Sequence, residues 1–216
     1  MINNIFPKIH KEGHKFLAIA ILITFFGLFI SKGLGLILLV LTIWVYYFFR
    51  DPERVSINDD RFLVSPADGV ISHISKVSGP AELNLENKSY VRVSIFMNAF
   101  NCHVNRSPAS GTVEDIFYKP GKFLNASLDK ASEENERNYY KMKTKNKEDD
   151  IIIVQIAGLI ARRIVCEVKK EQSLNQGERI GMIRFGSRVD IYFNDRKILA
   201  KVGQTVVAGE SLIAEA

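Results

Sequence analysis

"GMIRFGSRVDIYF", residues 181–193, alternates apolar and polar side chains in the manner of a half-buried β-strand. The alternation is interrupted in its middle by Gly186, which is followed by the small hydroxyl residue Ser187. Glycine weakens the interior of a strand and usually marks a bulge or the close approach of another backbone. Taken alone, the Gly-Ser pair therefore predicts a bulge, and any functional meaning has to come from the rest of the chain.

The chain after residue 50 predicts a mainly β (α+β) unit made of antiparallel sheets. Its apolar stretches are rich in Val, Ile and Phe and are separated by Gly, Pro and Asn, with short helices expected only at 97–102 and 122–132. The charge-rich stretch 129–150 predicts a solvated loop, with a flexible cover over an active site as the alternative. The predicted strands are 61–72, 88–97, 110–118, 151–157, 161–169, 180–185 and 188–193.

The C-terminal stretch "LAKVGQTVVAGESLIAEA", residues 199–216, carries two turn glycines, Gly203 and Gly209. This spacing resembles the β-turn sequence of biotinyl- or lipoyl-type barrel-sandwich domains, so the sheets are expected to have barrel-sandwich-like character. A carrier role would need a modifiable lysine at the tip of a tight hairpin, and Lys197 does not stand in that setting. The shape is therefore expected without the carrier function.

Residues 16–49 are almost entirely apolar and contain a single charge, Lys32. As one helix they would be about 51 Å long, well beyond the roughly 30 Å hydrocarbon layer of a bilayer. The stretch "SKGLG" at 31–35 divides them into halves, 16–30 and 34–49. The sequence therefore predicts a hydrophobic helical hairpin, which either crosses the membrane twice or enters one leaflet as a re-entrant or monotopic pair.

Basic residues flank this apolar segment on both sides, and positive residues favour the cytoplasmic side of a membrane. Both ends of the hairpin are therefore expected at the cytoplasmic face of the cell membrane. The formal net charge of +5 fits an anionic membrane better than nucleic acid, because the sequence has no basic recognition helix or aromatic-basic RNA motif. We predict a membrane anchor, 1–50, and a second domain, 51–216. The flanking residues are Lys8, Lys11, Lys15, Arg50 and Arg54.

Cysteine and histidine spacing gives no sign of a metal site. Cys102 and Cys166 are far apart and form no CxxC pair, which fits packing roles in a reducing compartment. The histidines form no HExxH or similar ligand pair, so we predict no structural metal. They are His10, His14, His73 and His103.

Four stretches behind the hairpin carry residue types that are suited to chemistry. They are "SPADG" at 65–69, "FNCHVNRSPASG" at 100–111, "SEENERN" at 132–138 and "IRFGSRVD" at 183–190. Each one alone has an ordinary explanation as a turn, a half-buried histidine or a charged surface. In this order, and after "FFRDPER", they resemble the phosphatidylserine decarboxylase family in its short, membrane-associated bacterial form. The resemblance extends over essentially the whole chain.

The resemblance gives the Gly-Ser pair a meaning, because members of this family are made as inactive proenzymes that break their own chain between a glycine and a serine. Transferred here, cleavage between Gly186 and Ser187 yields chains 1–186 and 187–216. The Ser187 hydroxyl would attack the Gly186 carbonyl to form an ester, and elimination would leave dehydroalanine, which hydrolyses to a pyruvoyl group and ammonia. Strand pairing would keep the two chains together as a heterodimer, with further oligomerisation left open.

The implied cofactor is this covalent pyruvoyl group made from Ser187, which acts as a built-in carbonyl. In the family, the amine of phosphatidylserine condenses with the ketone as a Schiff base, which accepts the electrons left by departing carbon dioxide. Protonation and hydrolysis then free phosphatidylethanolamine. The resemblance thus implies a carboxy-lyase of phospholipid biosynthesis that acts on phosphatidylserine in the membrane and has no nucleic-acid partner.

Asp68 and His103 are the further catalytic residues that the resemblance implies. Asp68 lies in a turn and matches the family's self-cleavage carboxylate. His103 is expected to transfer protons, because histidine titrates near working pH. Long-form relatives carry a second histidine where this chain has Arg106. The self-cleavage base is therefore left open: His103, His73, or a water molecule between Asp68 and Ser187.

Two arginines are candidates for substrate binding. Arg106 would hold the substrate carboxylate or phosphate by a bidentate contact, unless it forms a structural salt bridge. Arg188, next to the reactive serine, would attract the anionic headgroup, unless it is a strand residue that faces solvent. The chain reads "FGSR" where long forms commonly have "LGST", which keeps the Gly-Ser pair and changes its neighbours.

The C-terminal glycine turns leave one alternative function, a membrane-tethered barrel-sandwich adaptor or carrier without enzymatic activity. Adaptors of that kind usually add a long helical hairpin that projects outward, and the sequence shows no such hairpin. A hydrolase that uses Ser187 is also disfavoured, because no G-x-S-x-G nucleophile elbow surrounds this serine.

Overall fold

A computed structural model of the chain has two compact units, Met1–Glu53 and Arg54–Ala216. The division between them falls close to the expected boundary after residue 50. The described residues are 7–124, 133–145, 149–158, 163–184 and 187–216.

The N-terminal unit is a pair of apolar helices, α2 (His14–Ile30) and α3 (Lys32–Phe48), joined by one residue. This residue, Ser31, has an extended backbone, and its hydroxyl accepts a hydrogen bond of 3.1 Å from the Leu34 backbone N–H. Serine in this position caps the following helix. The predicted hydrophobic helical hairpin is thereby confirmed. The remaining elements are η1 (Lys11–Gly13) and the antiparallel pair β1 (Lys8–Ile9) and β2 (Arg50–Asp51).

Small residues let the two helices pack closely. A Cβ atom on Gly27 or Gly35 would lie within 2.3 Å of a leucine methyl group on the facing helix. The buried hydroxyls of Thr24 and Thr42 hydrogen-bond across the pair at 2.8 Å. Such contacts are typical of helix pairs in membranes. Lys11–Ile30 is long and apolar enough to cross a membrane, by length and composition, whereas α3 is shorter. Both membrane alternatives, two crossings or entry into one leaflet, stay open.

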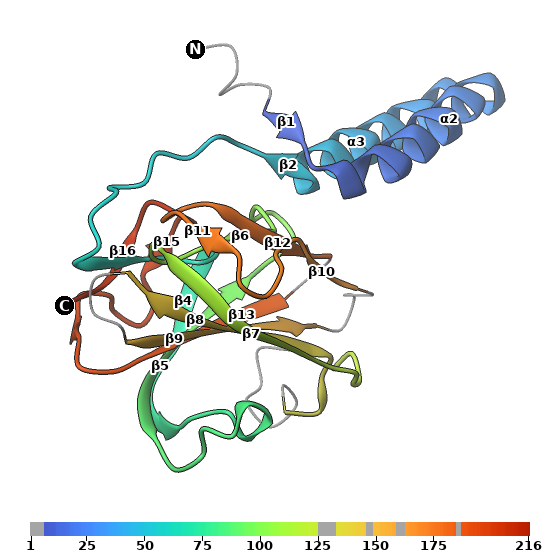
Figure 1. The fold of residues 1–216 in the computed structure, drawn as a ribbon. Coiled ribbons are helices and arrows are strands. Elements are labelled where there is room, and N and C mark those ends of the chain that lie inside the picture. The colour runs from blue at the N-terminus through green and yellow to red at the C-terminus, as the bar shows by residue number, and fades with distance from the viewer. Residues whose placement is uncertain (1–6, 125–132, 146–148, 159–162, 185–186) are drawn as a thin grey trace. The chain divides into compact units, whose positions relative to one another are not determined.

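The C-terminal unit is built mainly from antiparallel strands (Figure 1). Eight of them form one curled sheet, a half-barrel, in the order β11-β7-β8-β9-β13-β5-β4-β15. Two three-stranded sheets, β10-β12-β6 and β14-β16-β3, complete the described part of the unit. Strand outweighs helix, 42% against 22%, which confirms the mainly β fold. The elements are β3 (Phe62–Val64), β4 (Gly69–Ser78), η2 (Ala81–Leu83), β5 (Ser89–Met97), β6 (Val104–Arg106), β7 (Gly111–Lys119), β8 (Arg137–Thr144), β9 (Asp150–Ala157), β10 (Ile164–Cys166), β11 (Ser173–Leu174), β12 (Arg179–Ile183), β13 (Ser187–Phe193), β14 (Lys197–Ile198), β15 (Thr205–Val206) and β16 (Leu212–Glu215).

Strand β13 lies in the interior of the large sheet, between β9 and β5, and all of its residues are buried. Val189, Ile191 and Phe193 point into the larger hydrophobic core. Tyr192, on the other face, belongs to a second apolar cluster. The expectation of a half-buried strand is therefore wrong, because the second cluster covers the face that carries the polar residues.

Residues 137–144 form strand β8, so the expectation of a solvated loop is wrong for this part of 129–150. β8 pairs with β7 on one side and with β9 on the other, and Tyr139, Tyr140 and Met142 are buried. Composition misled here because the neighbouring strands, rather than the charges along the segment, decide which side chains are covered. Residues 129–132 and 146–148 lie outside the described residues.

Residues 98–101 form a tight turn and not the short helix expected at 97–102. Asn98 Oδ1 accepts a hydrogen bond of 2.8 Å from the Phe100 N–H. Asn101 Oδ1 accepts one of 2.9 Å from the Asn98 N–H. Asparagine side chains that bond the local backbone in this way compete with helix formation.

Several other elements occur with shifted boundaries. The predicted strand 61–72 is divided into β3 and β4 by a turn. Residues 122–124 are not helical, and the rest of the helix expected at 122–132 lies outside the described residues. Gly203 and Gly209 have φ values of +85° and +78°, so the C-terminal turns use a backbone conformation that glycine adopts readily.

Candidate active site

Several of the candidate residues lie at one end of the eight-stranded sheet. Neighbouring strands in the order β9-β13-β5-β4 run antiparallel, so β13 and β4 begin where β9 and β5 end. Ser187, the first residue of β13, is paired with Ala157 at the end of β9 and with Met97 at the end of β5. We call this side of the unit the Ser187 end. Gly186 lies outside the described residues.

Ser187 is completely buried, with 0% of its surface exposed. Its side chain shares a face of the sheet with Val189, and that face packs against the larger core. Within the described part of the chain, the Ser187 hydroxyl has no hydrogen-bond partner. A buried hydroxyl without a partner costs about 1–3 kcal/mol, and a role in chemistry is one reason for a protein to keep one.

His103 directly precedes β6 and is also completely buried. Its carbonyl oxygen accepts a hydrogen bond of 3.3 Å from the Ile183 N–H, at the end of β12. His103 therefore lies beside the strand that leads, three residues later, to the Gly-Ser pair. The His103 Nδ1 atom is 3.0 Å from the Asn101 carbonyl oxygen. A carbonyl only accepts, so Nδ1 carries a proton, and Nε2 is the ring nitrogen that can exchange one.

Asp68 lies in the turn before β4 and is 8% exposed. Its Oδ1 accepts a hydrogen bond of 2.8 Å from the Ala208 N–H. Arg54 Nη2 donates to both carboxylate oxygens, at 2.9 Å and 3.2 Å. No hydrogen bond between Asp68 and Ser187 occurs among the described residues. Sequence reasoning missed Arg54 as a partner of Asp68, because it was taken as a flank of the apolar segment.

Arg106 is 4% exposed, and its Nη1 donates a hydrogen bond of 2.8 Å to the Gly177 carbonyl oxygen. Its side chain also packs against Gly209, where an added Cβ atom would lie 3.1 Å from Arg106 Cδ. These contacts give Arg106 a place between two loops. Contact with the substrate carboxylate or phosphate stays a prediction.

Arg188 is 1% exposed, so the alternative of a strand residue that faces solvent is wrong. Its Nε and Nη2 atoms donate to the two carboxylate oxygens of Asp190 at 2.6 Å and 2.8 Å. Because side chains alternate along a strand, Arg188 points to the face opposite Ser187. This position favours a role within the sheet, and attraction of the headgroup by Arg188 stays a prediction.

His73 is exposed on β4, at an irregularity in its pairing with β5, and its Nδ1 lies 3.1 Å from the Ser72 hydroxyl. His73 is exposed, whereas His103 and Ser187 are both fully buried, and the choice of His103 or His73 as the self-cleavage base stays a prediction. The described residues also contain no group of three or more His, Cys, Asp or Glu side chains that could hold a metal ion.

A buried network of polar side chains reaches the Ser187 end, and sequence reasoning missed it. The Tyr140 hydroxyl donates to Gln155 Oε1 at 2.6 Å, and Gln155 Nε2 donates to Asn105 Oδ1 at 2.8 Å. Burial raises the pKa of Tyr140, which keeps the phenol protonated and fixes this direction. The Asn105 Nδ2 atom lies 3.7 Å from the Met97 sulfur. Met97 is the residue of β5 that pairs with Ser187. The sequence contained one sign of this network, which is the single polar residue Gln155 in the otherwise apolar stretch "IIIVQIA".

Asn135, within "SEENERN", is a second missed residue at this end and is completely buried. Its Nδ2 donates to the carbonyl oxygens of Ala157 at 2.7 Å and Leu124 at 2.9 Å. Its Oδ1 accepts from the Leu124 N–H at 2.8 Å. Since Ala157 pairs with Ser187, Asn135 fixes the backbone next to this serine.

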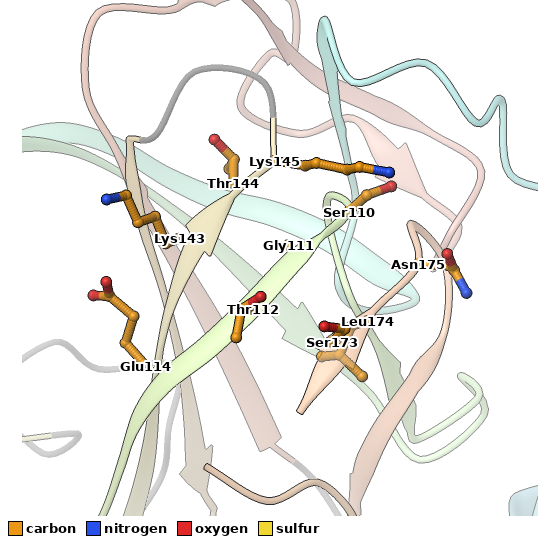
Figure 2. A pocket seen from close by; sticks show the side chains of 10 residues that line it. All are labelled: Ser110, Gly111, Thr112, Glu114, Lys143, Thr144, Lys145, Ser173, Leu174 and Asn175. Atoms are coloured by element: carbon orange, nitrogen blue, oxygen red, sulfur yellow. The ribbon is translucent and has the colours of Figure 1, made fainter. Parts of the chain in front are cut away.

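A pocket of about 570 Å³ lies elsewhere in the unit, where β7, β8 and β11 meet (Figure 2). Gly111 and Thr144, which line it, pair at the end of β8 that is far from Ala157. The pocket is therefore at the end of the sheet opposite Ser187. Figure 2 shows Lys143 and Lys145 pointing to different sides, so the lysines do not converge on one ligand position.

The sequence model of the family described as phosphatidylserine decarboxylase matches residues 41–214. The chain belongs to the phosphatidylserine decarboxylase family. Two similar proteins are both named "Phosphatidylserine decarboxylase proenzyme". The one from Pelagibacter ubique is 64% identical over 215 residues, which cover 100% of both chains. The one from Cereibacter sphaeroides is 48% identical over 216 residues, which cover 100% of this chain and 93% of that protein.

The resemblance drawn from the sequence motifs is thereby confirmed. Phosphatidylserine decarboxylases are carboxy-lyases, so the chain is an enzyme of that class. Family membership favours this activity over the alternative of a non-enzymatic barrel-sandwich adaptor.

Proposed function

We propose that the chain decarboxylates phosphatidylserine to phosphatidylethanolamine by means of a pyruvoyl group that it makes from Ser187. The observation that carries this proposal is the Ser187 hydroxyl, which is buried at the start of an interior strand without a hydrogen-bond partner in the described part of the chain. The proenzyme names of the similar proteins support a self-cleavage step. The complete burial of Ser187 also fits a group no larger than the serine from which it forms.

Self-cleavage would begin with attack of Ser187 Oγ on the Gly186 carbonyl carbon. The Oγ proton moves to a base, the peptide C–N bond breaks, and the freed nitrogen takes up a proton, which leaves an ester. Loss of the Ser187 α-proton expels the Gly186 carboxylate and gives dehydroalanine, and one water then releases ammonia and leaves the ketone. Glycine on the carbonyl side suits this chemistry, because it has no side chain to obstruct the attack.

The pairing of β13 with both neighbours supports retention of the new chain end. The segment after the cleavage site also supplies β15, which pairs with β4, and β16, which pairs with β3. We therefore expect chains 1–186 and 187–216 to stay together as a heterodimer.

When formed, the pyruvoyl ketone supplies a carbonyl that binds the substrate amine and accepts the electron pair released with carbon dioxide. His103 is proposed to carry the proton that returns to the substrate α-carbon, since its Nε2 can exchange a proton while the Asn101 carbonyl holds the ring. Asp68, held by Arg54, is proposed to act in self-cleavage. The apolar helix pair with its basic flanks supports a position at the cytoplasmic face of the cell membrane.

Intact mass spectrometry of the purified full chain tests the proposal. We expect two species, and the smaller should begin at residue 187 and weigh one ammonia less than a chain that starts with free serine. Borohydride should add two hydrogens to that species alone. Ser187→Ala should give one uncut chain without decarboxylase activity. An uncut wild-type chain that turns over phosphatidylserine would overturn the mechanism.

A further inference from the structure

The side-chain amide of Asn105 crosses strand β13 beside Ser187. Gln155 of β9 is paired with Val189, and Met97 of β5 is paired with Ser187. Paired residues project from the same face of a sheet, so both partner side chains share the face of the Ser187 hydroxyl. Asn105 contacts both of them, through its Oδ1 atom at 2.8 Å from Gln155 Nε2 and its Nδ2 atom at 3.7 Å from the Met97 sulfur. Because β13 lies between β9 and β5, the amide lies over residues 187–189.

Hydrogen bonds set which end of the Asn105 amide faces Met97. The Tyr140 hydroxyl donates to Gln155 Oε1 at 2.6 Å, and Asn138 Nδ2 donates to the same oxygen at 3.4 Å. With two donors on its oxygen, Gln155 presents its Nε2 donor to Asn105 Oδ1. The N–H groups of Asn105 are therefore directed to Met97, the residue opposite Ser187.

Two buried polar groups on this face have weak bonding or none. The Ser187 hydroxyl has no hydrogen-bond partner among the residues that the structure describes. Within the same residues, the N–H groups of Asn105 contact only a thioether sulfur, which is a weak acceptor. Both side chains are 0% exposed. A donor that lies unused beside an oxygen is of greatest value when negative charge develops on that oxygen.

We propose that Asn105 is a catalytic residue of self-cleavage, whose N–H group donates to the Ser187 side-chain oxygen as this oxygen becomes negative. This inference rests on the proposed function. A change of the Ser187 rotamer would turn the oxygen toward the amide without movement of the backbone. The neutral amide would stabilise the charge without taking or releasing a proton.

The same oxygen carries developing charge in two steps. In the first, it loses its proton to the base and forms a bond to the Gly186 carbonyl carbon. In the last, the bond between Ser187 Cβ and this oxygen breaks, and its electron pair leaves with the Gly186 carboxylate. A donor fixed over residue 187 would therefore lower the barrier of both steps.

The rate constant of self-cleavage tests this role. The full chain is made by cell-free synthesis in the presence of lipid vesicles, and the cut fraction is followed against time by mass spectrometry. Asn105→Leu keeps the approximate size of the side chain and removes the donor, so we expect the rate constant to fall about a hundredfold. A purely structural role would lower the final cut fraction and leave the rate constant of the folded chains unchanged.

Gln176→Leu is the matched control, because it also removes a buried amide, which is 4% exposed and donates to the Phe62 carbonyl at 2.7 Å. The Gln176 N–H donates to the Ser110 hydroxyl, at the pocket opposite the Ser187 end. This variant should be less stable and should cleave with the wild-type rate constant.

The direction of the amides is tested through Tyr140, which is a positioning residue in this proposal. Tyr140→Phe removes the donor that fixes Gln155, so the Asn105 amide can reverse. We expect the rate constant to fall about fivefold, which is the net effect of one hydrogen bond. Tyr139→Phe removes a neighbouring phenol on the opposite face of the sheet and should cleave at the wild-type rate.

The outcomes separate this proposal from the proposed function. If the wild-type chain is cut before Ser187 and Asn105→Leu is cut with the same rate constant, the role of Asn105 is overturned and the proposed function stands. An uncut wild-type chain that decarboxylates phosphatidylserine would overturn both. A slow Asn105→Leu beside a normal Gln176→Leu would support both.

Discussion

Arg54 contacts both carboxylate oxygens of Asp68 through a single nitrogen, and the two side chains are only 17% and 11% exposed. A charge-assisted hydrogen bond in such a protected place is worth more than a surface ion pair. Arg54 is also the first residue of the β unit, directly after the anchor. Arg54 therefore acts as a positioning residue. It holds the Asp68 carboxylate, which is proposed to act in self-cleavage.

Replacing this arginine should slow the formation of the mature enzyme. We expect Arg54→Gln to lower the rate of self-cleavage about tenfold or more, because Asp68 loses its charged partner. Arg54→Lys should restore part of the rate. The measurement is the fraction of cut chain against time by mass spectrometry, at a temperature where all variants are folded.

Arg61→Gln is the matched control for this change, because Arg61 pairs with Asp59 on the surface and is 70% exposed. It should cleave at the wild-type rate. If Arg54→Gln also does so while Asp68→Asn is slow, the contact between Arg54 and Asp68 has only a structural role.

At the scale of elements, the sequence predicted β5, β7, β9 and β13 because short stretches rich in Val, Ile and Phe, separated by turn residues, are sufficient to indicate strands. It did not predict β8, since the burial of Tyr139 and Tyr140 comes from strands on both sides of a segment whose own composition is polar. Ser187 could be found from its motif. Its supports, Gln155 and Asn135, could not be assigned, because their hydrogen-bond partners are distant in the chain.

Asn135 joins three segments that meet at the Ser187 end, so its loss should affect both stability and cleavage. Asn135→Ala removes three hydrogen bonds made by a fully buried side chain, and we expect the free energy of unfolding to fall by about 3 kcal/mol. Cleavage should also be slower well below the melting temperature, because the Ala157 backbone beside Ser187 is no longer fixed. Denaturant unfolding and a cleavage time course provide the two readouts.

Asn175→Ala, an exposed asparagine at the opposite end of the sheet, serves as the comparison and should change neither quantity. If the Asn135→Ala variant is less stable but cleaves at the normal rate, Asn135 has a role in stability only.

At the scale of the whole molecule, acid sensitivity should come from carboxylates held by buried cations. Burial opposes the charge of Asp149, but hydrogen bonds from Arg196 and Thr144 outweigh it and lower the pKa of the carboxyl below its ordinary value of 3.8. A pKa that is lower in the folded state stabilises the fold above the unfolded value, and this contribution is lost as the pH falls through the folded value. The loss should therefore occur below about pH 4.

Asp149→Asn should reduce the free energy of unfolding by about 2 kcal/mol at neutral pH, because the Arg196 side chain is fully buried and loses its charged partner. It should also flatten the decline in stability between neutral pH and pH 3. Thermal unfolding of the full chain across this range measures both effects. Asp59→Asn alters a solvent-screened pair, so its stability should change with pH as that of the wild type does. An acid decline in Asp149→Asn as steep as that of the wild type would show that Asp149 is not the source of the acid sensitivity.

Because β13 lies inside the large sheet, its position affects both the order of folding and cleavage and the lifetime of the cut enzyme. Its pairing partners come from far earlier in the chain, so a continuous chain has to reach the folded arrangement before any break occurs. After a break before Ser187, thermal disruption would set free a 30-residue fragment that could return only by diffusion. The working lifetime of the cut enzyme would then depend on how slowly it comes apart, because reassembly at cellular dilution would be negligible.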